Sequence, residues 1–376
     1  MRVLHLFSNC KWTGPAEPAL NLCAALRGVG VETEFACAPD AGNSVNMVVE
    51  SARARGIVPM LDFHLNKHRH PFKNLQDVRA LRQYLREQRF DIVHCHLDND
   101  HAIAARALRG SKTPIVRSSY EGLGLKGDRR HQYMLDRTAL LLEPSEIARE
   151  HDLRVFGLAP EKVAVVPGAI DTNRFDPARC SASLRERLTI PEDAYVVGIV
   201  ARMQTHRHFE DLLQATRQLI DVMPNAHLLI VGRGTHQQRV VEDPARDMGM
   251  ADHVHITGFV DGDDFVGAIQ AMDTGVYLVP GSDGTCRAAR EILAMGKPLV
   301  VADRGMLREI VADGESGMVT DGSVDALLSA FCELGQDVAR RTAMGQQARQ
   351  RAEEHFGLTA QATRVKQHYE ALLNHL

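Results

Sequence analysis

The sequence predicts an α/β protein built from two doubly wound parallel-sheet lobes, and three observations support this fold class. The chain has 376 residues, which at about 100 to 200 residues per domain corresponds to two domains. Short apolar strands alternate with helices in both halves of the chain, a pattern typical of βαβ units around a parallel sheet. A segment rich in turn residues, 167–190, separates the two series.

In the first half, apolar runs predict strands, and apolar residues at helical spacing predict helices between them. The expected strands are 3–7, 32–38, 57–63, 91–94 and 114–117, and the expected helices lie near 19–26, 75–88 and 101–108.

The second half repeats the alternation. Its expected strands are 195–200, 227–231, 254–257, 274–278 and 298–301, and its expected helices are 209–222, 237–248, 263–271 and 285–295. A further helix follows the last strand, so it can pack across both lobes. The predicted organisation is a first domain 1–166, a linker 167–190, a second domain 191–358 and a C-terminal helix 359–376.

Composition excludes several classes of protein. The 44 Lys and Arg residues against 48 Asp and Glu give a net charge of −4, so no global field gathers nucleic acid. The few aromatic residues do not alternate with basic ones, which also argues against nucleic-acid binding. The seven cysteines form no CxxC pair and indicate free thiols in a reducing compartment. No signal segment or membrane-spanning run is recognisable, and we expect a cytoplasmic protein.

The segment 278–309 carries the most information about function. Doubly wound lobes bind ligands outside the carboxyl ends of their strands, so the cleft between two lobes is the expected site. Here a strand ends and a helix begins, and the amides near Gly284, Thr285 and Cys286 suit a phosphate. Asp283 and Glu291 could hold the hydroxyls of a sugar and a ribose. The alternative is that Asp283 caps the helix and Glu291 is a solvated charge.

A second group follows the strand 195–200. Arg202 and Arg207 share one loop, and two guanidinium groups there could neutralise the charge on a departing nucleotide. The alternative is a pair of surface arginines. The nearby Gly232-Arg233-Gly234 lacks the third glycine of a dinucleotide loop, so a tight turn is the better interpretation.

Two further groups lie in the first half. His94, Cys95 and His96, with Asp98, Asp100 and His101 close by, contain enough ligand types for a metal but lack an established zinc spacing. We expect no metal, with His94 in the strand and His96 lining the cleft. Basic residues also cluster in 64–70 and 117–137. These are either solvated loop charges or a surface for a phosphorylated or membrane-embedded acceptor.

Taken together, these motifs resemble those of the retaining glycosyltransferases of family 4, which have the GT-B fold of two Rossmann-like lobes facing across a cleft. The resemblance covers essentially the whole chain. The matching segments, in order, are Gly14-Pro15-Ala16-Glu17, 91–96, 166–175, 202–207, 231–234, 258–260, 283–291, 296–298 and 309–311.

The resemblance implies roles at the matching positions. Arg202 and Arg207 would grip the donor diphosphate, Asp283 would hold the donor sugar and Glu291 the ribose. Gly284, Thr285 and Cys286 would supply phosphate-binding amides, Phe259 and Val260 would contact the base, and the turn Gly14-Pro15 would face phosphate and acceptor. His96 and Tyr120 would lie on the acceptor side. Members of this family generally need no metal for the transfer, and we expect no cofactor.

The sequence also departs from the family pattern. Arg207 replaces Lys, Asp283 replaces Glu, His208 and Pro15 each replace Gly, and Tyr120 stands where many relatives place a histidine. Gly168-Ala169 replaces Asn-Gly in the same comparison.

The expected activity is transfer of a sugar from a UDP-type or GDP-type nucleotide-sugar to a glycan or glycolipid hydroxyl with retention of configuration, as in polysaccharide or lipopolysaccharide biosynthesis. Contact with the inner face of a membrane fits such acceptors. The alternatives are a GT-B sugar-nucleotide epimerase or hydrolase, and a catalytically degenerate nucleotide-binding protein. Nucleobase, sugar, acceptor, linkage and oligomeric state stay open at this level.

Overall fold

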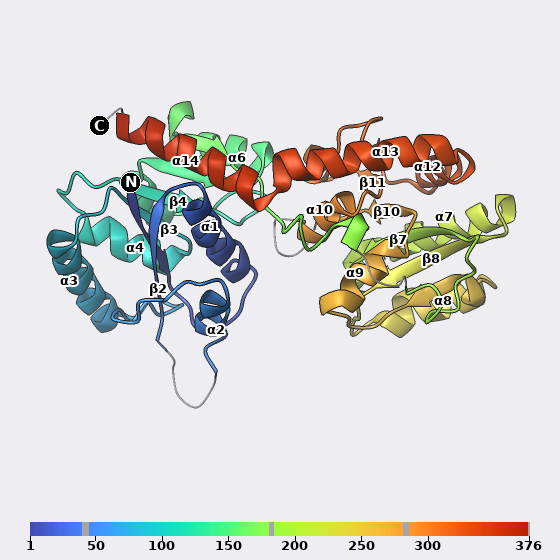
Figure 1. Cartoon of the computed structure of the whole chain (residues 1–376), viewed down its shortest axis with the longest axis horizontal. Helices are drawn as coiled ribbons and strands as arrows, with labels where there is room; N and C mark the ends of the chain where they lie inside the picture. Colours follow the sequence, from blue (N-terminus) through green and yellow to red (C-terminus); the bar gives the residue numbers. More distant parts are fainter. Residues whose placement is uncertain (40–44, 180–183, 281–285, 375–376) are drawn as a thin grey trace. The chain divides into compact units, whose positions relative to one another are not determined.

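A computed structural model describes residues 1–39, 45–179, 184–280 and 286–374 of the chain. The chain divides into two compact units (Figure 1). Unit 1 contains Met1–Ala169 together with Leu358–Leu376, and unit 2 contains the described residues of 170–357. Each unit holds one six-stranded sheet in which every strand pairing is parallel. The predicted fold class of two doubly wound α/β lobes is therefore confirmed.

The sheet of unit 1 has the strand order β2-β1-β3-β4-β5-β6. Helices cover both of its faces, and the apolar side chains alternate between two buried clusters. The strands are β1 (Arg2–Phe7), β2 (Glu32–Cys37), β3 (Ile92–Cys95), β4 (Ile115–Ser118), β5 (Leu140–Glu143) and β6 (Val163–Val165). The helices are α1 (Ala16–Gly28), α2 (Met47–Ala54), α3 (Pro71–Glu87), α4 (Asp98–Ala107), α5 (Arg129–Leu135), α6 (Glu146–Phe156) and α14 (Leu358–Asn374).

The sheet of unit 2 has the strand order β12-β11-β10-β7-β8-β9. Its strands are β7 (Tyr195–Val200), β8 (Ala226–Val231), β9 (Val254–Ile256), β10 (Thr274–Tyr277), β11 (Leu299–Ala302) and β12 (Gly317–Thr320). Its helices are α7 (Phe209–Val222), α8 (Asp243–Asp247), α9 (Gly262–Gln270), α10 (Arg287–Ala294), α11 (Leu307–Ile310), α12 (Val324–Gln336) and α13 (Val338–Arg351), with short turns η3 (Thr205–Arg207), η4 (Gln238–Glu242) and η6 (Ala352–Phe356).

The expected strand 57–63 is wrong. Only one isolated bridge forms there, between Ala36 and Met60. Gly56 has a left-handed φ of 69°, Val58 is 88% exposed, and Pro59 has no N–H to donate to a ladder. The apolar residues of this segment therefore do not form a strand.

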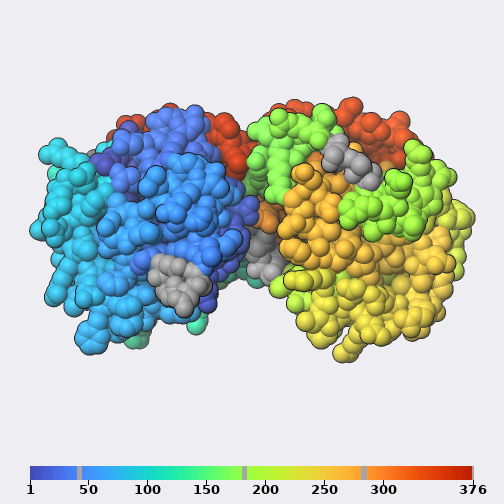
Figure 2. Space-filling view, turned by 60° about the horizontal axis from the view of Figure 1, so that its bottom comes forward, coloured from blue at the N-terminus to red at the C-terminus, as the bar shows by residue number. Residues whose placement is uncertain are grey.

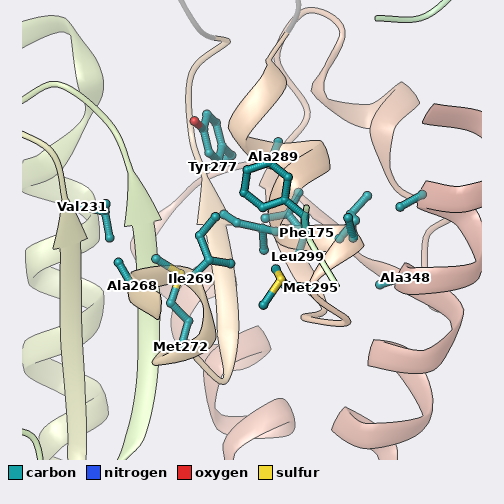
Figure 3. Packing of buried hydrophobic residues seen from close by; sticks show 14 of the residues in the cluster. Phe175, Val231, Ala268, Ile269, Met272, Tyr277, Ala289, Met295, Leu299 and Ala348 are labelled. Atoms are coloured by element: carbon teal, nitrogen blue, oxygen red, sulfur yellow. The ribbon is translucent and has the colours of Figure 1, made fainter. Parts of the chain in front are cut away.

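The segment 167–190, expected as a linker, belongs largely to unit 2. The boundary between the units falls between Ala169 and Ile170. The side chains of Ile170, Phe175 and Ile190 are buried in a core cluster of unit 2. Figure 3 shows Phe175 among residues of β10, α9 and α10. The proline-containing turns identified loops correctly, but those loops are packed against the second sheet.

Helix α14 returns to unit 1 after the chain has completed unit 2 (Figure 1). Its residues Ala362, Val365 and Tyr369 are fully buried in a cluster with Leu22 and Leu26 of α1. The last helix is thus part of the core of unit 1. Among the described residues, no helix combines the length and apolar character needed to cross a membrane.

Candidate functional site

The carboxyl ends of β7 and β10 mark the expected ligand site of unit 2. These two strands are neighbours, and the chain continues from β7 to β8 on the opposite side of β7 from β10. In a doubly wound sheet the connections diverge at such a point and leave a crevice at the carboxyl edge. The loop 201–208 follows β7, and residues 278–280 follow β10. The two arginines predicted to bind the donor diphosphate therefore lie at a topological switch point.

Arg207 lies in this crevice with its side chain largely buried. It closes the short turn η3 and is 7% exposed. Its Nη1 donates a hydrogen bond to the carbonyl oxygen of Pro280, 2.9 Å away, in the loop after β10. Its Nε is also buried and has no hydrogen-bond partner among the described residues. The guanidinium is thus held against Pro280 with donor capacity that the described residues do not use.

Arg202 is placed differently on the same loop. It directly follows Ala201 at the end of β7, and its side chain is exposed. It makes no hydrogen bond or ion pair to another described residue, so its guanidinium can move to meet a ligand. The two arginines therefore combine one fixed and one adjustable donor at the same strand end.

His208 explains one departure from the family pattern. It has φ 56° and ψ 37°, a left-handed conformation in which glycine is favoured, and it stands where relatives have Gly. Its Nδ1 bonds Oδ2 of Asp211 at 2.9 Å. This contact to the first turn of α7 compensates in part for the backbone strain.

The loop after β10 carries the remaining predicted phosphate contacts. Asp283, Gly284 and Thr285 lie outside the described residues, so their predicted roles stay predictions. Cys286 is 1% exposed and has φ 47°, and α10 begins at the next residue. The helix therefore starts two residues later than the expected range 285–295.

Glu291 is buried within α10. It is 4% exposed, and its Oε1 lies 3.3 Å from Nε of Arg287 one turn earlier. The alternative interpretation of Glu291 as a solvated helix charge is wrong, since a solvated carboxylate would not be buried. A buried carboxylate of this kind can accept hydrogen bonds from a diol.

The glycines of Gly232-Arg233-Gly234 are explained by a close approach of two loops. A Cβ on Gly232 would lie 2.4 Å from the carbonyl oxygen of Ala201, and one on Gly234 would lie 2.1 Å from that of Met203. The loop after β8 therefore supports the backbone that carries Arg202. This contact requires the two glycines independently of any dinucleotide fingerprint.

Phe259 and Val260, predicted to contact the base, follow β9 at the same edge of the sheet. Phe259 is 66% exposed, and the Arg233 guanidinium lies 5.1 Å from the centre of its ring. Val260 is half-buried against the core of unit 2. The exposed ring is available for stacking on a planar group.

In unit 1 the predicted residues lie at the carboxyl edge of the other sheet. Gly14 is exposed in the turn between β1 and α1, and Pro15 is the residue immediately before α1. His96 follows β3 and Tyr120 follows β4. We expected His96 to line the cleft, but its side chain is fully buried within unit 1.

His96 instead belongs to a buried hydrogen-bonded group on one face of the sheet. Its Nδ1 lies 2.7 Å from Oη of Tyr120, and its Nε2 lies 2.9 Å from Nδ1 of His5. His94 shares this face because side chains alternate along β3, and it bonds Ser118 and Tyr369. Tyr120 is only partly buried, so it is the member that can reach a ligand.

Burial keeps the three imidazoles neutral. It lowers the pKa of His5 to about 3 and that of His94 and His96 well below the ordinary value, with the Arg117 guanidinium adding to the effect on His94 and His96. Burial also raises the pKa of the Tyr120 hydroxyl, which stays protonated near neutral pH. Tyr120 can therefore donate or accept a hydrogen bond but carries no charge.

The group that could hold a metal consists of His5, His94 and His96, whose ligand atoms lie within 4.8 Å of one another. The hydrogen bonds above use both ring nitrogens of His94 and His96. The rings of His94 and His96 are stacked at an interplanar angle of 18°, so their in-plane lone pairs do not converge well. These contacts favour an internal network, and the expected lack of a metal stays a prediction.

The nearby acids have other partners. Asp100 accepts hydrogen bonds from the backbone N–H groups of Ser8, His96 and Leu97, and burial raises its pKa to about 7. Asp98 pairs with Arg117 at 3.1 Å. The acids of this region therefore organise loops of unit 1.

Sequence analysis missed Glu143, the last residue of β5. Glu143 is fully buried at the carboxyl edge of the sheet, and burial raises its pKa well above the ordinary value. A charged residue ending the apolar run 140–142 was the available signal, but the run was too short to be recognised as a strand.

Comparison with known proteins decides the family. The model for Glycosyltransferase Family 4 matches residues 13–174, and the model for Glycosyl transferases group 1 matches residues 181–351. The chain belongs to glycosyltransferase family 4. This membership confirms the resemblance found in the sequence and identifies the chain as a member of a glycosyltransferase family.

Two relatives with described activities are similar in sequence to this family 4 glycosyltransferase. It is 28% identical over 310 residues to a D-inositol 3-phosphate glycosyltransferase of Kineococcus radiotolerans, across 74% of this chain and 71% of the relative. It is 31% identical over 251 residues to a GDP-mannose-dependent alpha-(1-6)-phosphatidylinositol monomannoside mannosyltransferase of Mycobacterium tuberculosis, across 64% of this chain. The chain spans 61% of the length of the mycobacterial enzyme.

Solved structures confirm the GT-B fold. A glycosyltransferase from Rickettsia africae has a TM-score of 0.81 and 15% identity, covering 100% of this chain and 99% of that one. The HepE protein of Anabaena in complex with UDP has a TM-score of 0.78 and 17% identity, covering 99% of this chain and 100% of that one.

Proposed function

We propose that this family 4 glycosyltransferase moves a hexose from a UDP or GDP donor to a hydroxyl group of a glycan or glycolipid, with retention of configuration. Unit 2 would bind the donor and unit 1 the acceptor. The observation that carries the donor site is the buried Arg207 guanidinium, held by Pro280 at the switch point between β7 and β10.

The chemistry needs positive charge where the leaving group forms. The bond between the anomeric carbon and the diphosphate oxygen breaks, and the acceptor oxygen bonds to that carbon from the same face. The acceptor hydroxyl gives its proton to the departing phosphate, and a nucleoside diphosphate is released. Arg207 and Arg202 would stabilise the charge that builds on this phosphate, as preorganised donors do in other enzymes. The proposal uses no metal and no cofactor.

The two carboxylates would hold the neutral parts of the donor. Glu291, buried in α10, would accept hydrogen bonds from the ribose hydroxyls, and Asp283 would hold the sugar. The names of the two relatives refer to D-inositol 3-phosphate and to a phosphatidylinositol monomannoside, and both compounds contain inositol. We include hydroxylated acceptors of that kind, among other glycans, in the panel that tests the proposal.

The test is a turnover assay with UDP-sugars and GDP-sugars, with and without an acceptor panel. We expect release of nucleoside diphosphate that depends on the acceptor, and NMR of the product should show the anomeric configuration of the donor. Rapid consumption of the donor without an acceptor would favour an epimerase or hydrolase. Binding of a nucleoside diphosphate without turnover across the panel would favour a degenerate family member.

A further inference from the structure

A cavity of about 250 Å³ opens in unit 1 where the helices α3, α4 and α5 come together. It is lined by residues from each helix and from the loop before α3. Four of these residues are arginines, namely Arg69, Arg106, Arg129 and Arg130. This cavity has no part in the donor site proposed for unit 2.

The structure brings together the two basic stretches that are far apart in the sequence. Arg69 comes from the stretch 64–70, and Arg129 and Arg130 come from the stretch 117–137. Arg106 adds a fourth guanidinium from α4. No carboxylate is among the lining residues. Four like charges around one small cavity repel one another, and an anion in the cavity would relieve that repulsion.

The acids nearest in sequence to these arginines are engaged elsewhere. The carboxylate of Asp98 pairs with Arg117 at 3.1 Å and with His131 at 3.5 Å. Oδ1 of Asp128 accepts hydrogen bonds from the backbone N–H groups of Arg130 and His131 at the start of α5. The pKa of Asp98 is lowered mainly by its hydrogen bond to His131 and by Arg117, with a smaller contribution from Arg130. Arg130 is therefore the one cavity arginine whose charge acts on these two acids among the interactions of the described residues.

The polar side of the cavity is fixed by a pair of asparagines. Asn99 is 1% exposed, and its Oδ1 accepts a hydrogen bond from Nδ2 of Asn74 at 2.7 Å. Nδ2 of Asn99 donates to the carbonyl oxygen of Asn66 at 2.8 Å. These bonds tie α3, α4 and the loop before α3 together, so the cavity is a built feature of unit 1.

The four arginines divide into two pairs. Arg106 donates to the carbonyl oxygen of Ala102, and Arg130 donates to that of Asp98. Arg69 and Arg129 are exposed, and their side chains make no hydrogen bond or ion pair to any described residue. Two guanidinium groups are thus available to close on an anion, and the planar fork of arginine matches a phosphate.

Helix α3, which contributes Asn74 to the cavity lining, also carries exposed apolar side chains. Phe72 is 78% exposed and Leu75 is 49% exposed, both in the first turns of α3 next to Lys73. Figure 2 shows the light-blue segment that contains α3 on the surface of unit 1. Exposed apolar residues beside cations are typical of surfaces that lie against anionic lipid.

We propose that this cavity binds a phosphate-bearing group, which the four arginines hold at a site separate from the donor site of unit 2. The phosphate can belong to a lipid headgroup or to a free phosphate ester. The exposed Phe72 and Leu75 on α3 favour the lipid. The proposal does not depend on sugar transfer, so it can be tested by binding alone.

The test compares two charge-matched double variants of the full chain. Arg69→Ala with Arg129→Ala removes the two unengaged guanidinium groups of the cavity. Arg79→Ala with Arg109→Ala removes two exposed arginines from the same region of unit 1 that do not line the cavity. The side chains of both pairs make no hydrogen bond or ion pair to another described residue, so we expect both double variants to fold. Affinity for the best nucleoside diphosphate should be equal in both variants and in the wild type, which controls for the donor site.

The first probe is glycerol 3-phosphate, whose binding is measured by calorimetry while the nucleoside diphosphate saturates the donor site. The second probe is a vesicle of phosphatidylglycerol or phosphatidylcholine, whose binding is measured by sedimentation. We expect the cavity variant to lose about tenfold or more in affinity for a phosphate probe, and the control variant to bind as the wild type does. If the cavity variant loses affinity for phosphatidylglycerol vesicles, the ligand is a lipid headgroup. If it loses affinity for glycerol 3-phosphate alone, the ligand is a free phosphate ester. The proposal is overturned if the wild type binds neither probe, or if both variants lose affinity equally.

Discussion

The guanidinium of Arg207 is the charged group most firmly placed at the donor site. It is buried at the end of β7 and bonded to Pro280, whereas Arg202 on the same loop is exposed. The Nε of Arg207 has no hydrogen-bond partner among the described residues, and a buried cation with an unused donor is costly to a protein. This cost is the reason that we propose a ligand contact for Arg207.

Arg207→Ala should lower kcat by about 10²- to 10³-fold, because one preorganised donor to the leaving phosphate is lost. Arg207→Lys should retain part of the activity, since Lys keeps the charge but loses the fork. Steady-state kinetics with the best donor measures both. Arg217→Ala, which removes an exposed partner of Asp221 on α7, is the control and should behave as the wild type. Near-normal turnover in purified Arg207→Ala would remove this residue from the mechanism.

Glu291 and Arg287 form an ion pair. Mutating each residue on its own therefore distinguishes the role of the carboxylate from the role of the ion pair. Glu291→Gln should raise KM for the nucleotide-sugar by about tenfold, because a charge-assisted hydrogen bond to the ribose is weakened. Arg287→Gln breaks the same pair but leaves the carboxylate in place, and it should change KM much less. Equal effects of the two substitutions on KM would show that the ion pair matters and that the ribose contact does not exist.

At the level of elements, the loops after β7 and β8 support each other. Gly234→Ala would place a Cβ 2.1 Å from the carbonyl oxygen of Met203. The backbone must shift, and we expect a loss of about 1 to 3 kcal/mol in the free energy of unfolding, together with weaker nucleotide binding.

Urea unfolding and nucleotide titration of the same Gly234→Ala preparation measure both effects. Gly28→Ala is the matched control, since nothing lies within 4 Å of its Cβ and its backbone is not left-handed. Unchanged stability of Gly234→Ala would mean that the loops do not depend on this close approach.

The buried histidines of β1 and β3 predict that the free energy of unfolding of unit 1 depends on pH. The folded-state pKa of His5 is lowered to about 3, while the unfolded value is about 6.5. Between these values the unfolded chain binds a proton that the folded chain does not, so the contribution of neutral His5 is complete above about pH 6.5 and is lost as the pH falls.

His5→Phe removes this titration. The stability advantage of the wild type over the variant should be largest at pH 7 to 8 and should shrink by about 1 kcal/mol per pH unit between pH 6 and 4. Urea unfolding of both proteins across this range gives the difference directly. A difference that stays constant with pH, or grows in acid, would contradict the assignment of a neutral buried imidazole.

Most strands were predictable because short apolar runs alternate with helices, and the expected bounds of β7 and α7 match the structure. The segment 57–63 failed because Pro59 and the exposed Val58 interrupt an otherwise apolar run. The strand β5 was missed because four apolar and acidic residues show no periodicity. Length alone was not sufficient, because the helices α12 and α13 were not predicted either.

The candidate site was predictable only in part. The arginines and Glu291 were recognisable because strand ends and helix starts can be located in the sequence. The burial of His96, and the meeting of Arg69 with Arg129 in one cavity, depend on tertiary contacts between distant segments. No local pattern carries that information.

At the level of the whole molecule, the chain returns to unit 1 through α14. Tyr369 fills the core between α1 and the sheet, and its hydroxyl bonds His94. Tyr369→Ala should therefore cost about 3 to 5 kcal/mol of unfolding free energy. Glu370→Ala changes the adjacent exposed residue and should have little effect. Thermal melts of the two variants give the comparison, and equal midpoints would mean that α14 is not part of the core.

The most direct test is a crystal structure with the nucleoside diphosphate that binds most tightly. We predict phosphate oxygens within hydrogen-bond distance of Arg202 and Arg207, at the carboxyl ends of β7 and β10. A nucleotide bound at another place, with neither Arg202 nor Arg207 in contact with it, would contradict the assignment of the donor site.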